Sequence, residues 1–197
     1  MNQDFWNERY SEIDFAYGKQ ANDFVVAQAF QPARKILCLA EGEGRNAVYL
    51  AQQGHDVTCI DYSEAGIAKM NHLANEKCVE ITTICADLAE VTLAENEWDA
   101  IVIIFGHFPP AIRQHVHPQL YKALKPGGRL ILEAYRKAQI DYKTGGPMNP
   151  SMLYSKEELA TDFQAFSTIA IEETVREVNE GAFHHGQAAV VQVIGQK

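Results

Sequence analysis

The stretch Ile36-Leu37-Cys38-Leu39-Ala40-Glu41-Gly42-Glu43-Gly44-Arg45-Asn46 decides the fold of this chain. Residues 36–39 are an apolar run of strand length, and a glycine-bearing turn over 40–46 follows it. Apolar residues at 47, 48, 50 and 51 then recur at helical spacing, and a second apolar run over 57–60 ends at Asp61. Strand, glycine turn, helix, strand and acid, in this order, predict one βαβ unit of a nucleotide-binding fold.

Each part of this unit has a physical role in binding. Gly42 and Gly44 allow a positive φ and let the backbone approach a ligand closely, although glycines can also simply close a loop. We expect a helix that begins near Glu43 to direct free N–H groups and its positive dipole end at an anionic group over the turn. Asp61 can accept hydrogen bonds from ribose hydroxyls. The unit therefore predicts a ligand with a ribose and an anionic end.

Length and composition limit the class of protein. A chain of 197 residues with 47% hydrophobic residues predicts one globular domain over 1–197 with a substantial core. The net charge of −9 weighs against nucleic acid or an anionic membrane as the partner. The N-terminus lacks the basic and apolar regions of a signal peptide, and no apolar run reaches membrane-spanning length. We therefore expect a cytoplasmic protein.

The four cysteines are Cys38, Cys59, Cys78 and Cys85. Their spacing forms no CxxC or other zinc pattern, so we expect no metal site. Cys38 and Cys59 lie inside predicted buried strands, and Cys85 ends another. We interpret all four as small buried apolar residues in a reducing compartment.

The remaining periodicity alternates between strands and helices. Helices are predicted over 2–10, 21–30 (ended by Pro32), 63–76, 110–124 and 155–164. Further strands are predicted over 79–85, 98–105, 129–135, 168–178 and 188–194, with a turn at 125–128 and a long loop at 136–150. The sum is a three-layer α/β/α sandwich around a Rossmann-like, mostly parallel, seven-stranded sheet with an antiparallel terminal hairpin.

Three regions of the chain should contribute different parts of a site. Residues 1–32 form a helical segment that either closes over the ligand as a lid or packs on the sheet edge. Residues 33–135 form the cofactor-binding core, and residues 136–197 supply a loop, a helix and a hairpin on the substrate side. Ligands of such sheets bind at the carboxyl ends of the strands, where the 40–46 turn, Asp61, Asp87 and the 105–110 loop should meet.

Four motifs in this order resemble those of the class I S-adenosylmethionine-dependent methyltransferases. They are residues 36–46, Asp61-Tyr62-Ser63, Asp87-Leu88 and Leu124-Lys125-Pro126-Gly127-Gly128, and the resemblance covers roughly residues 30–135. The stretches 6–10 and 41–46 are similar to the small bacterial branch related to tellurite-resistance and thiopurine methyltransferases. This resemblance implies S-adenosylmethionine as cofactor and in-line methyl transfer to a small-molecule acceptor, such as a thiol or a metalloid oxyanion.

The resemblance also implies which residues hold the cofactor. These are Ala40, Glu41, Gly42 and Gly44 at the methionine part, Asp61 at the ribose, Tyr62, Ala86, Asp87 and Leu88 around the adenine, and Phe105 nearby. The family commonly has glycine where this chain has Ala40 and a small residue where it has Glu41. The Glu41 carboxylate either faces the amino group of the methionine part or lies in solvent, and the second arrangement is the expectation.

Candidate acceptor-side residues lie on the same rim. His107 follows the fourth strand of the sheet and is the candidate to orient or deprotonate an acceptor. The candidates for contact with the acceptor are Tyr17, Tyr135 and His184, with Glu133 and His185 beside them. His115 and His117 are interpreted as surface positions of a helix.

Two alternatives remain open. Gly42-x-Gly44-x-x-Ala47 with Asp61 also satisfies the dinucleotide fingerprint, which predicts an NAD(P)-dependent oxidoreductase. That chemistry calls for a proton-relay group such as a Tyr-x-x-x-Lys pair, and none follows the fifth strand. The other alternative is a non-catalytic protein that keeps the cofactor pocket. A monomer and a homodimer are both compatible with the sequence, because the edge hairpin over 168–194 could pair with a second chain.

Overall fold

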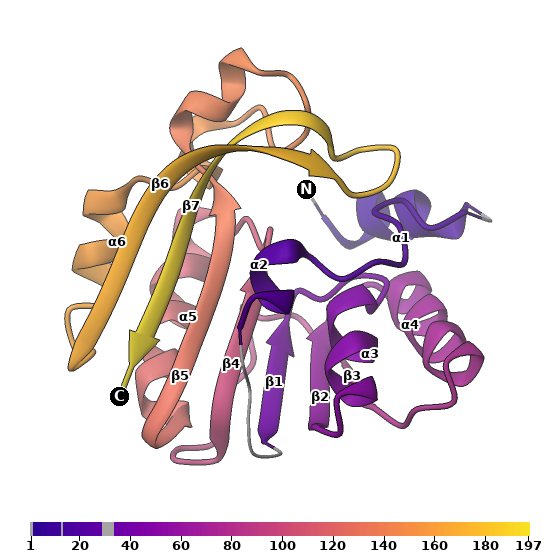
Figure 1. The fold of residues 1–197 in the computed structure, drawn as a ribbon, viewed down its shortest axis with the longest axis horizontal. Coiled ribbons are helices and arrows are strands. Elements are labelled where there is room, and N and C mark those ends of the chain that lie inside the picture. Colours follow the sequence, from indigo (N-terminus) through magenta and orange to yellow (C-terminus); the bar gives the residue numbers. More distant parts are fainter. Residues whose placement is uncertain (1, 13, 29–33) are drawn as a thin grey trace.

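The computed structural model describes residues 2–12, 14–28 and 34–197, which form a seven-stranded sheet flanked by helices (Figure 1). The strand order is β3-β2-β1-β4-β5-β7-β6. The strands are β1 (Lys35–Leu39), β2 (Asp56–Asp61), β3 (Thr82–Cys85), β4 (Trp98–Ile104), β5 (Leu124–Tyr135), β6 (Thr168–Asn179) and β7 (His185–Gln196). Strands β1 to β5 pair in parallel, and β7 is antiparallel to both of its neighbours. The predicted Rossmann-like sheet with a terminal hairpin is confirmed.

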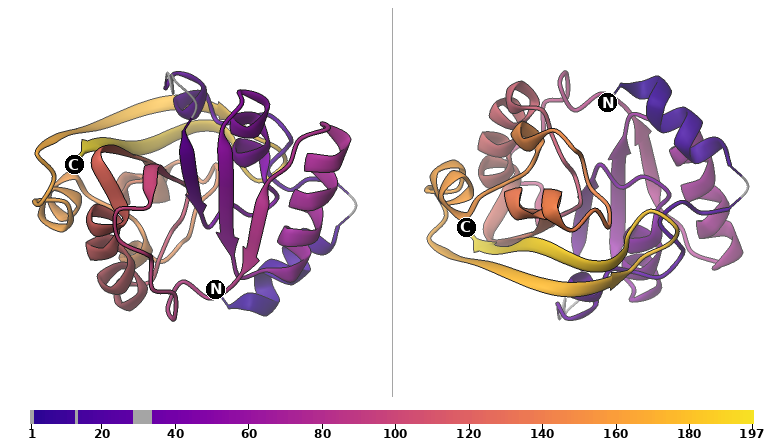
Figure 2. Two further views of the ribbon diagram at one scale, coloured as in Figure 1. Left: turned by 90° about the horizontal axis from the view of Figure 1, so that it is seen from below. Right: turned by 90° about the horizontal axis from the view of Figure 1, so that it is seen from above.

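Helices cover both faces of the sheet, as Figure 2 shows. They are α1 (Gln3–Ser11), α2 (Asp23–Val26), α3 (Arg45–Gln52), α4 (Glu64–Glu76), α5 (Pro110–Ala123) and α6 (Lys156–Asp162), with short 3₁₀ turns η1 (Lys137–Asp141) and η2 (Pro150–Met152). Successive strand side chains point to opposite faces. Leu37 and Leu39 therefore pack in the core beneath α5 and α6, while Ile36 and Cys38 pack in the core beneath α3 and α4.

Several boundaries differ from the predicted ones. Helix α3 begins at Arg45, because Gly44 is its N-cap with a φ of 88°. The predicted turn at 125–128 lies inside β5, where Gly127 N–H donates to the Lys197 carbonyl and so continues the sheet. The described part of the predicted 21–30 helix is α2, which Asn22 caps, while Phe30 and Pro32 lie outside the described residues.

Two burial predictions were wrong. Cys78 and Cys85 are exposed, because Cys78 follows the end of α4 and Cys85 belongs to the edge strand β3. His117 is buried instead of lying on a helix surface, because α6 covers that side of α5 and brings Asp162 Oδ2 within 2.8 Å of His117 Nδ1. The local spacing of apolar residues reveals neither the exposure of the two cysteines nor the burial of His117.

The β6–β7 hairpin extends beyond the sheet and crosses above its carboxyl edge towards α1 (Figure 1). Its tip contacts the segment that follows α1, where Ala182 N–H donates to the Ala16 carbonyl over 3.1 Å. At Gly181, an added Cβ would lie 2.5 Å from that same carbonyl oxygen, so the tip requires a glycine there. The hairpin tip and the segment after α1, which are far apart in the sequence, therefore meet above the sheet.

Candidate active site

The carboxyl ends of β1 to β4 open into a cavity of about 750 Å³. Its floor comes from the loops after these strands, and its walls come from α1, residues 17–18, the 145–147 loop and the hairpin tip. The structure brings these cofactor candidates together in its lining: Ala40, Glu41, Gly42, Asp61, Tyr62, Ala86, Asp87, Leu88 and Phe105. His107, Tyr17 and His184 also line it. Gly44 lies behind the lining as the N-cap of α3.

The turn after β1 is shaped by left-handed backbone. Ala40, Gly42 and Gly44 have φ values of 52°, 65° and 88°. An added Cβ at Gly42 would lie 2.7 Å from the Tyr10 hydroxyl, so only glycine fits beneath this ring of α1. Ala40 carries a side chain in a conformation that favours glycine, and this is the physical cost of its departure from the usual motif.

Glu41 lies neither in solvent nor free in the cavity. Its residue exposure is 8%, and its Oε1 accepts hydrogen bonds from the N–H groups of Asn46 (2.9 Å) and Ala47 (2.8 Å). The carboxylate therefore occupies the N-terminus of α3, where the sequence predicted an anionic part of the ligand. Burial raises the pKa of Glu41 to about 7, against the opposing effect of these hydrogen bonds.

Asp61 connects the loops after β1 and β2 through hydrogen bonds. Its Oδ2 accepts from Gly42 N–H over 2.8 Å and its Oδ1 accepts from Ser63 N–H over 2.9 Å. Burial raises the pKa of this carboxyl, although the hydrogen bonds oppose the shift. Each carboxylate oxygen has a second lone pair, so Asp61 can hold the β1 turn and still accept from ligand hydroxyls.

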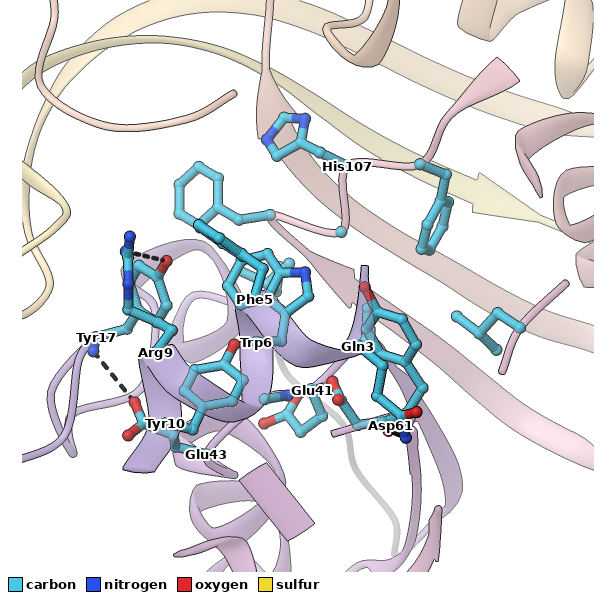
Figure 3. Close-up of a pocket in the computed structure, with 18 of the residues that line it drawn as sticks. Gln3, Phe5, Trp6, Arg9, Tyr10, Tyr17, Glu41, Glu43, Asp61 and His107 are labelled. Atoms are coloured by element: carbon cyan, nitrogen blue, oxygen red, sulfur yellow. Dashed lines mark hydrogen bonds between the residues drawn. The ribbon is translucent and has the colours of Figure 1, made fainter. Parts of the chain in front are cut away.

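Asp61 lies at the opposite end of the labelled group from Arg9 and Tyr17 (Figure 3), and the residues that follow β2 and β3 line the same cavity. Gln3 of α1 donates to the Tyr62 carbonyl over 2.6 Å, so the helix also closes on this end. Asp87 Oδ1 accepts from Ala89 N–H over 2.9 Å, which fixes the turn after β3. Burial raises the pKa of Tyr62 to about 12, so its hydroxyl stays protonated.

His107 is held by two backbone groups. Tyr135 N–H donates to its Nε2 over 3.3 Å, which leaves the ring proton on Nδ1, 2.9 Å from the Met152 carbonyl. Burial lowers the pKa of His107 to about 4. The ring is thus neutral with both nitrogens engaged, which argues against proton abstraction by this side chain.

The acceptor candidates differ in their access to the cavity. Tyr17 and His184 line it with their ring centroids 4.5 Å apart. Tyr135 is fully buried behind the lining, because Gly145 and Gly146 lie against its ring. His185 is exposed, and Glu133 is fully buried beneath the hairpin, where it pairs with Arg176.

Sequence reasoning missed four charged residues of the lining, namely Arg9, Glu43, Arg45 and Glu64. Glu43 accepts from the N–H groups of Ala16 (3.2 Å) and Tyr17 (3.3 Å) and so anchors the segment after α1. Arg45 pairs with Glu180 over 2.6 Å, which ties α3 to the hairpin. Arg9 lies in the aromatic stretch 6–10, which was the available signal for it.

These residues fit an adenosyl cofactor. The volume lies within the range of about 300–1,000 Å³ that is usual for small-molecule sites. Gly42 lies so close to Tyr10 that no side chain fits at this position, and both carboxylates and aromatic rings line the cavity. Among the described residues, no group of three or more His, Cys, Asp or Glu side chains is arranged to hold a metal ion. Within the same part of the chain, no helix is long and apolar enough to cross a membrane.

The sequence comparisons point to methyltransferases. Residues 36–128 match the family described as "Methyltransferase domain". The probable S-adenosyl-L-methionine-dependent methyltransferase TehB of Haemophilus influenzae is 25% identical over 185 residues, 90% of this chain and 60% of the relative. A demethylmenaquinone methyltransferase of Thermus thermophilus is 28% identical over 121 residues, 60% of this chain and 54% of the relative. The chain thus spans little more than half the length of these curated relatives.

Solved structures show the same fold. The structure of TehB from Haemophilus influenzae has a TM-score of 0.68 at 22% identity and covers 99% of this chain and 66% of that one. A structure described as "Conversion of a Disulfide Bond into a Thioacetal Group during Echinomycin Biosynthesis" has a TM-score of 0.75 at 19% identity, covering 99% and 92%. The chain resembles the class I methyltransferases of the tellurite-resistance type, and residues 36–128 match a methyltransferase domain shared with S-adenosyl-L-methionine-dependent relatives.

Proposed function

We propose that this protein transfers a methyl group from S-adenosylmethionine to a small-molecule acceptor that is already nucleophilic at neutral pH, such as a thiolate or a metalloid oxyanion. The cofactor supplies an activated methyl group on a sulfonium. The protein then has to position the acceptor, exclude water and balance charge. We also propose that residues 1–197 act as one domain, with 1–32 as the lid, 33–135 as the cofactor-binding core and 136–197 on the acceptor side.

The proposed cofactor contacts follow the strand ends. Asp61 would accept from ribose hydroxyls with the lone pairs that Gly42 and Ser63 leave free. Tyr62, Ala86, Asp87 and Leu88 would surround the adenine, and Phe105 would lie beside the sulfonium region, where it stacks on Tyr135 with ring centroids 4.5 Å apart. Ala40, Glu41, Gly42 and Gly44 would shape the methionine end.

The hydrogen bonds and the lowered pKa of His107 are the main support for the proposed acceptor class. Both of its ring nitrogens bond to backbone groups, and its pKa is lowered to about 4 by burial. It therefore orients the loop after β4 rather than removing a proton. An acceptor that ionises by itself needs no general base, whereas an alcohol or a phenol does. Tyr17 and His184 are the residues we assign to direct contact with the acceptor.

The test is production of S-adenosylhomocysteine in the presence of thiols, selenite, tellurite, amines and phenols at several pH values. We expect turnover with thiols or oxyanions, with a rate that rises with the ionised fraction of each acceptor. The His184→Ala variant should raise KM for the acceptor while binding S-adenosylhomocysteine as the wild type does. Turnover restricted to phenols or amines would contradict the proposed acceptor class.

A further inference from the structure

Four backbone N–H groups at the turn after β1 already bond to acceptors within the protein. Two N–H groups at the start of α3 bond to Glu41 Oε1, and Gly42 N–H bonds to Asp61. Gly44 N–H donates to the Glu41 carbonyl over 3.4 Å. Glu41 and Glu43 of this turn and Asp61 at the end of β2 line the cavity, and Glu43 is paired with Lys69 over 2.8 Å. This part of the site therefore suits a cation and disfavours an anion.

Arg9 supplies an unpaired positive charge in the same cavity. Its Nη1 lies 3.4 Å from the Tyr17 hydroxyl, and its guanidinium lies 3.8 Å from the ring centroid of Phe183 and 5.1 Å from that of Phe5. Every Asp and Glu of the chain falls within the described residues, and none forms an ion pair with Arg9. Arg45 also lines the cavity, but its charge is paired with Glu180 through Nη2, while its buried Nη1 has no hydrogen-bond partner.

The fold places Arg9 above this turn. Tyr10, the next residue of α1, covers Gly42 with its hydroxyl. Tyr17, the hydrogen-bond partner of Arg9, is fixed to Glu43 through its backbone N–H. Figure 3 shows Arg9 beside Tyr17 at one end of the labelled group and Asp61 at the other. Arg9 therefore lies at the end of the cavity away from the proposed ribose site.

We propose that Arg9 binds the α-carboxylate of the cofactor's methionine part, while Glu41 faces its α-ammonium. This assignment rests on the proposed function. The methionine end is a zwitterion whose carboxylate needs a positively charged donor, and Arg9 lines the cavity without an ion pair, whereas Arg45 is paired with Glu180. The planar guanidinium can bind a carboxylate through two N–H groups, and the aromatic rings of Phe5 and Phe183 hold it in place. Helix α1 would then close on the cofactor through a charged contact.

The test is calorimetric titration with S-adenosylhomocysteine and with S-adenosyl-3-thiopropylamine, which lacks only the carboxylate. We expect the wild type to bind S-adenosylhomocysteine about 10-fold or more tightly than the amine, in line with a charged hydrogen bond. Arg9→Gln should lose this difference by weakening S-adenosylhomocysteine alone. Arg9→Lys should retain part of it, because the charge remains and the two-pronged geometry is lost.

Controls separate a direct contact from a folding effect. Glu8→Gln changes an exposed residue of the same helix and should leave both affinities unchanged. Equal weakening of both ligands in Arg9→Gln would overturn the proposal, since the carboxylate would not be its target, and unchanged affinities would overturn it as well. Failure of the wild type to bind S-adenosylhomocysteine at all would instead reject the proposed function.

Discussion

Ala40 and Phe105 directly follow the adjacent strands β1 and β4 in the same left-handed conformation, with φ values of 52° and 54°. Each backbone N–H still belongs to the sheet, since Ala40 donates to Ile60 (2.9 Å) and Phe105 donates to Glu133 (2.7 Å). The chain therefore leaves the sheet abruptly at both strands. Of the five described non-glycine residues with a positive φ, these two lie where the cavity begins.

Replacing Ala40 by glycine should stabilise the protein. A left-handed alanine costs roughly 1–2 kcal/mol, and the extra unfolded-state entropy of glycine offsets about 0.4–1 kcal/mol of the relief. We expect the free energy of unfolding to rise by about 0.5–1 kcal/mol in urea titrations. As the control, Ala47→Gly within α3 should lower it by about 1 kcal/mol. A loss of stability in Ala40→Gly would contradict the strain argument.

The buried Glu41 carboxyl should make stability pH-dependent. Its pKa is raised from 4.5 to about 7, so the folded state holds its proton more tightly than the unfolded state. The contribution of Glu41 to stability is complete below pH 4.5 and is lost as the pH rises through 7. Glu41→Gln keeps an acceptor for α3, and between pH 5 and 8 it should lose about 1–3 kcal/mol less stability than the wild type. If the urea midpoints of the wild type and of Glu41→Gln changed equally between pH 5 and pH 8, the raised pKa of Glu41 would be refuted.

Asp61→Ala should weaken cofactor binding. The substitution removes the acceptor for Gly42 and Ser63 and the acceptor proposed for the ribose. We expect the affinity for S-adenosylhomocysteine to fall by about 1–3 kcal/mol in calorimetry. Asp56→Ala changes the exposed first residue of the same strand and serves as the control. Unchanged binding in Asp61→Ala would remove the ribose assignment.

His107 should act through structure. Because its pKa is lowered from 6.5 to about 4, its contribution to stability is present above pH 6.5 and is lost as the pH falls through 4. His107→Ala should lower the free energy of unfolding by about 2–4 kcal/mol, since two backbone groups lose their partner. The pH profile of kcat between 6 and 9 should keep its shape. Disappearance of a limb of that profile in the variant would show that His107 transfers a proton.

Arg176→Met should strongly destabilise the protein through the hairpin. Arg176 pairs with Glu133, which is fully buried, and with Glu180 over 3.1 Å. Loss of the cation leaves the buried Glu133 carboxylate without an ion-pair partner, whereas Glu180 keeps Arg45, so we expect a cost of about 3–5 kcal/mol in the free energy of unfolding. Lys137→Met breaks a more exposed pair with Glu158 and should cost less than about 1 kcal/mol. Similar costs for the two variants would contradict the buried network.

Local patterns were sufficient to predict the sheet. The apolar runs at 36–39, 57–60 and 98–105 occur as β1, β2 and β4, because fully buried parallel strands need continuous apolar residues. The same pattern predicts that the glycine turn and Asp61 lie close together, since parallel strands bring their carboxyl ends to one edge of the sheet. The C-terminal hairpin was predicted from two β-rich segments, and β6 and β7 confirm it.

Long-range pairing accounts for most of what the sequence did not show. Arg45 and Glu180 are 135 positions apart, and His117 meets Asp162 across 45 positions, so no local spacing indicates either pair. The prediction for Glu41 was wrong for a different reason. Its carboxylate reaches the start of α3 only because Ala40 and Gly42 have left-handed backbone, which reverses the chain between the strand and the helix.

The contact between the hairpin tip and the segment after α1 has an evolutionary consequence. Both partners lie outside residues 36–128, the part that matches the methyltransferase family. The part of the cavity that is proposed to face the acceptor is thus formed by segments outside the matched residues 36–128. Replacement of the hairpin tip and the segment after α1 would therefore alter the acceptor side, while the strand-end contacts proposed for the ribose and the adenine would stay intact. Such replacement must keep the two segments compatible, because each forms the surface on which the other rests.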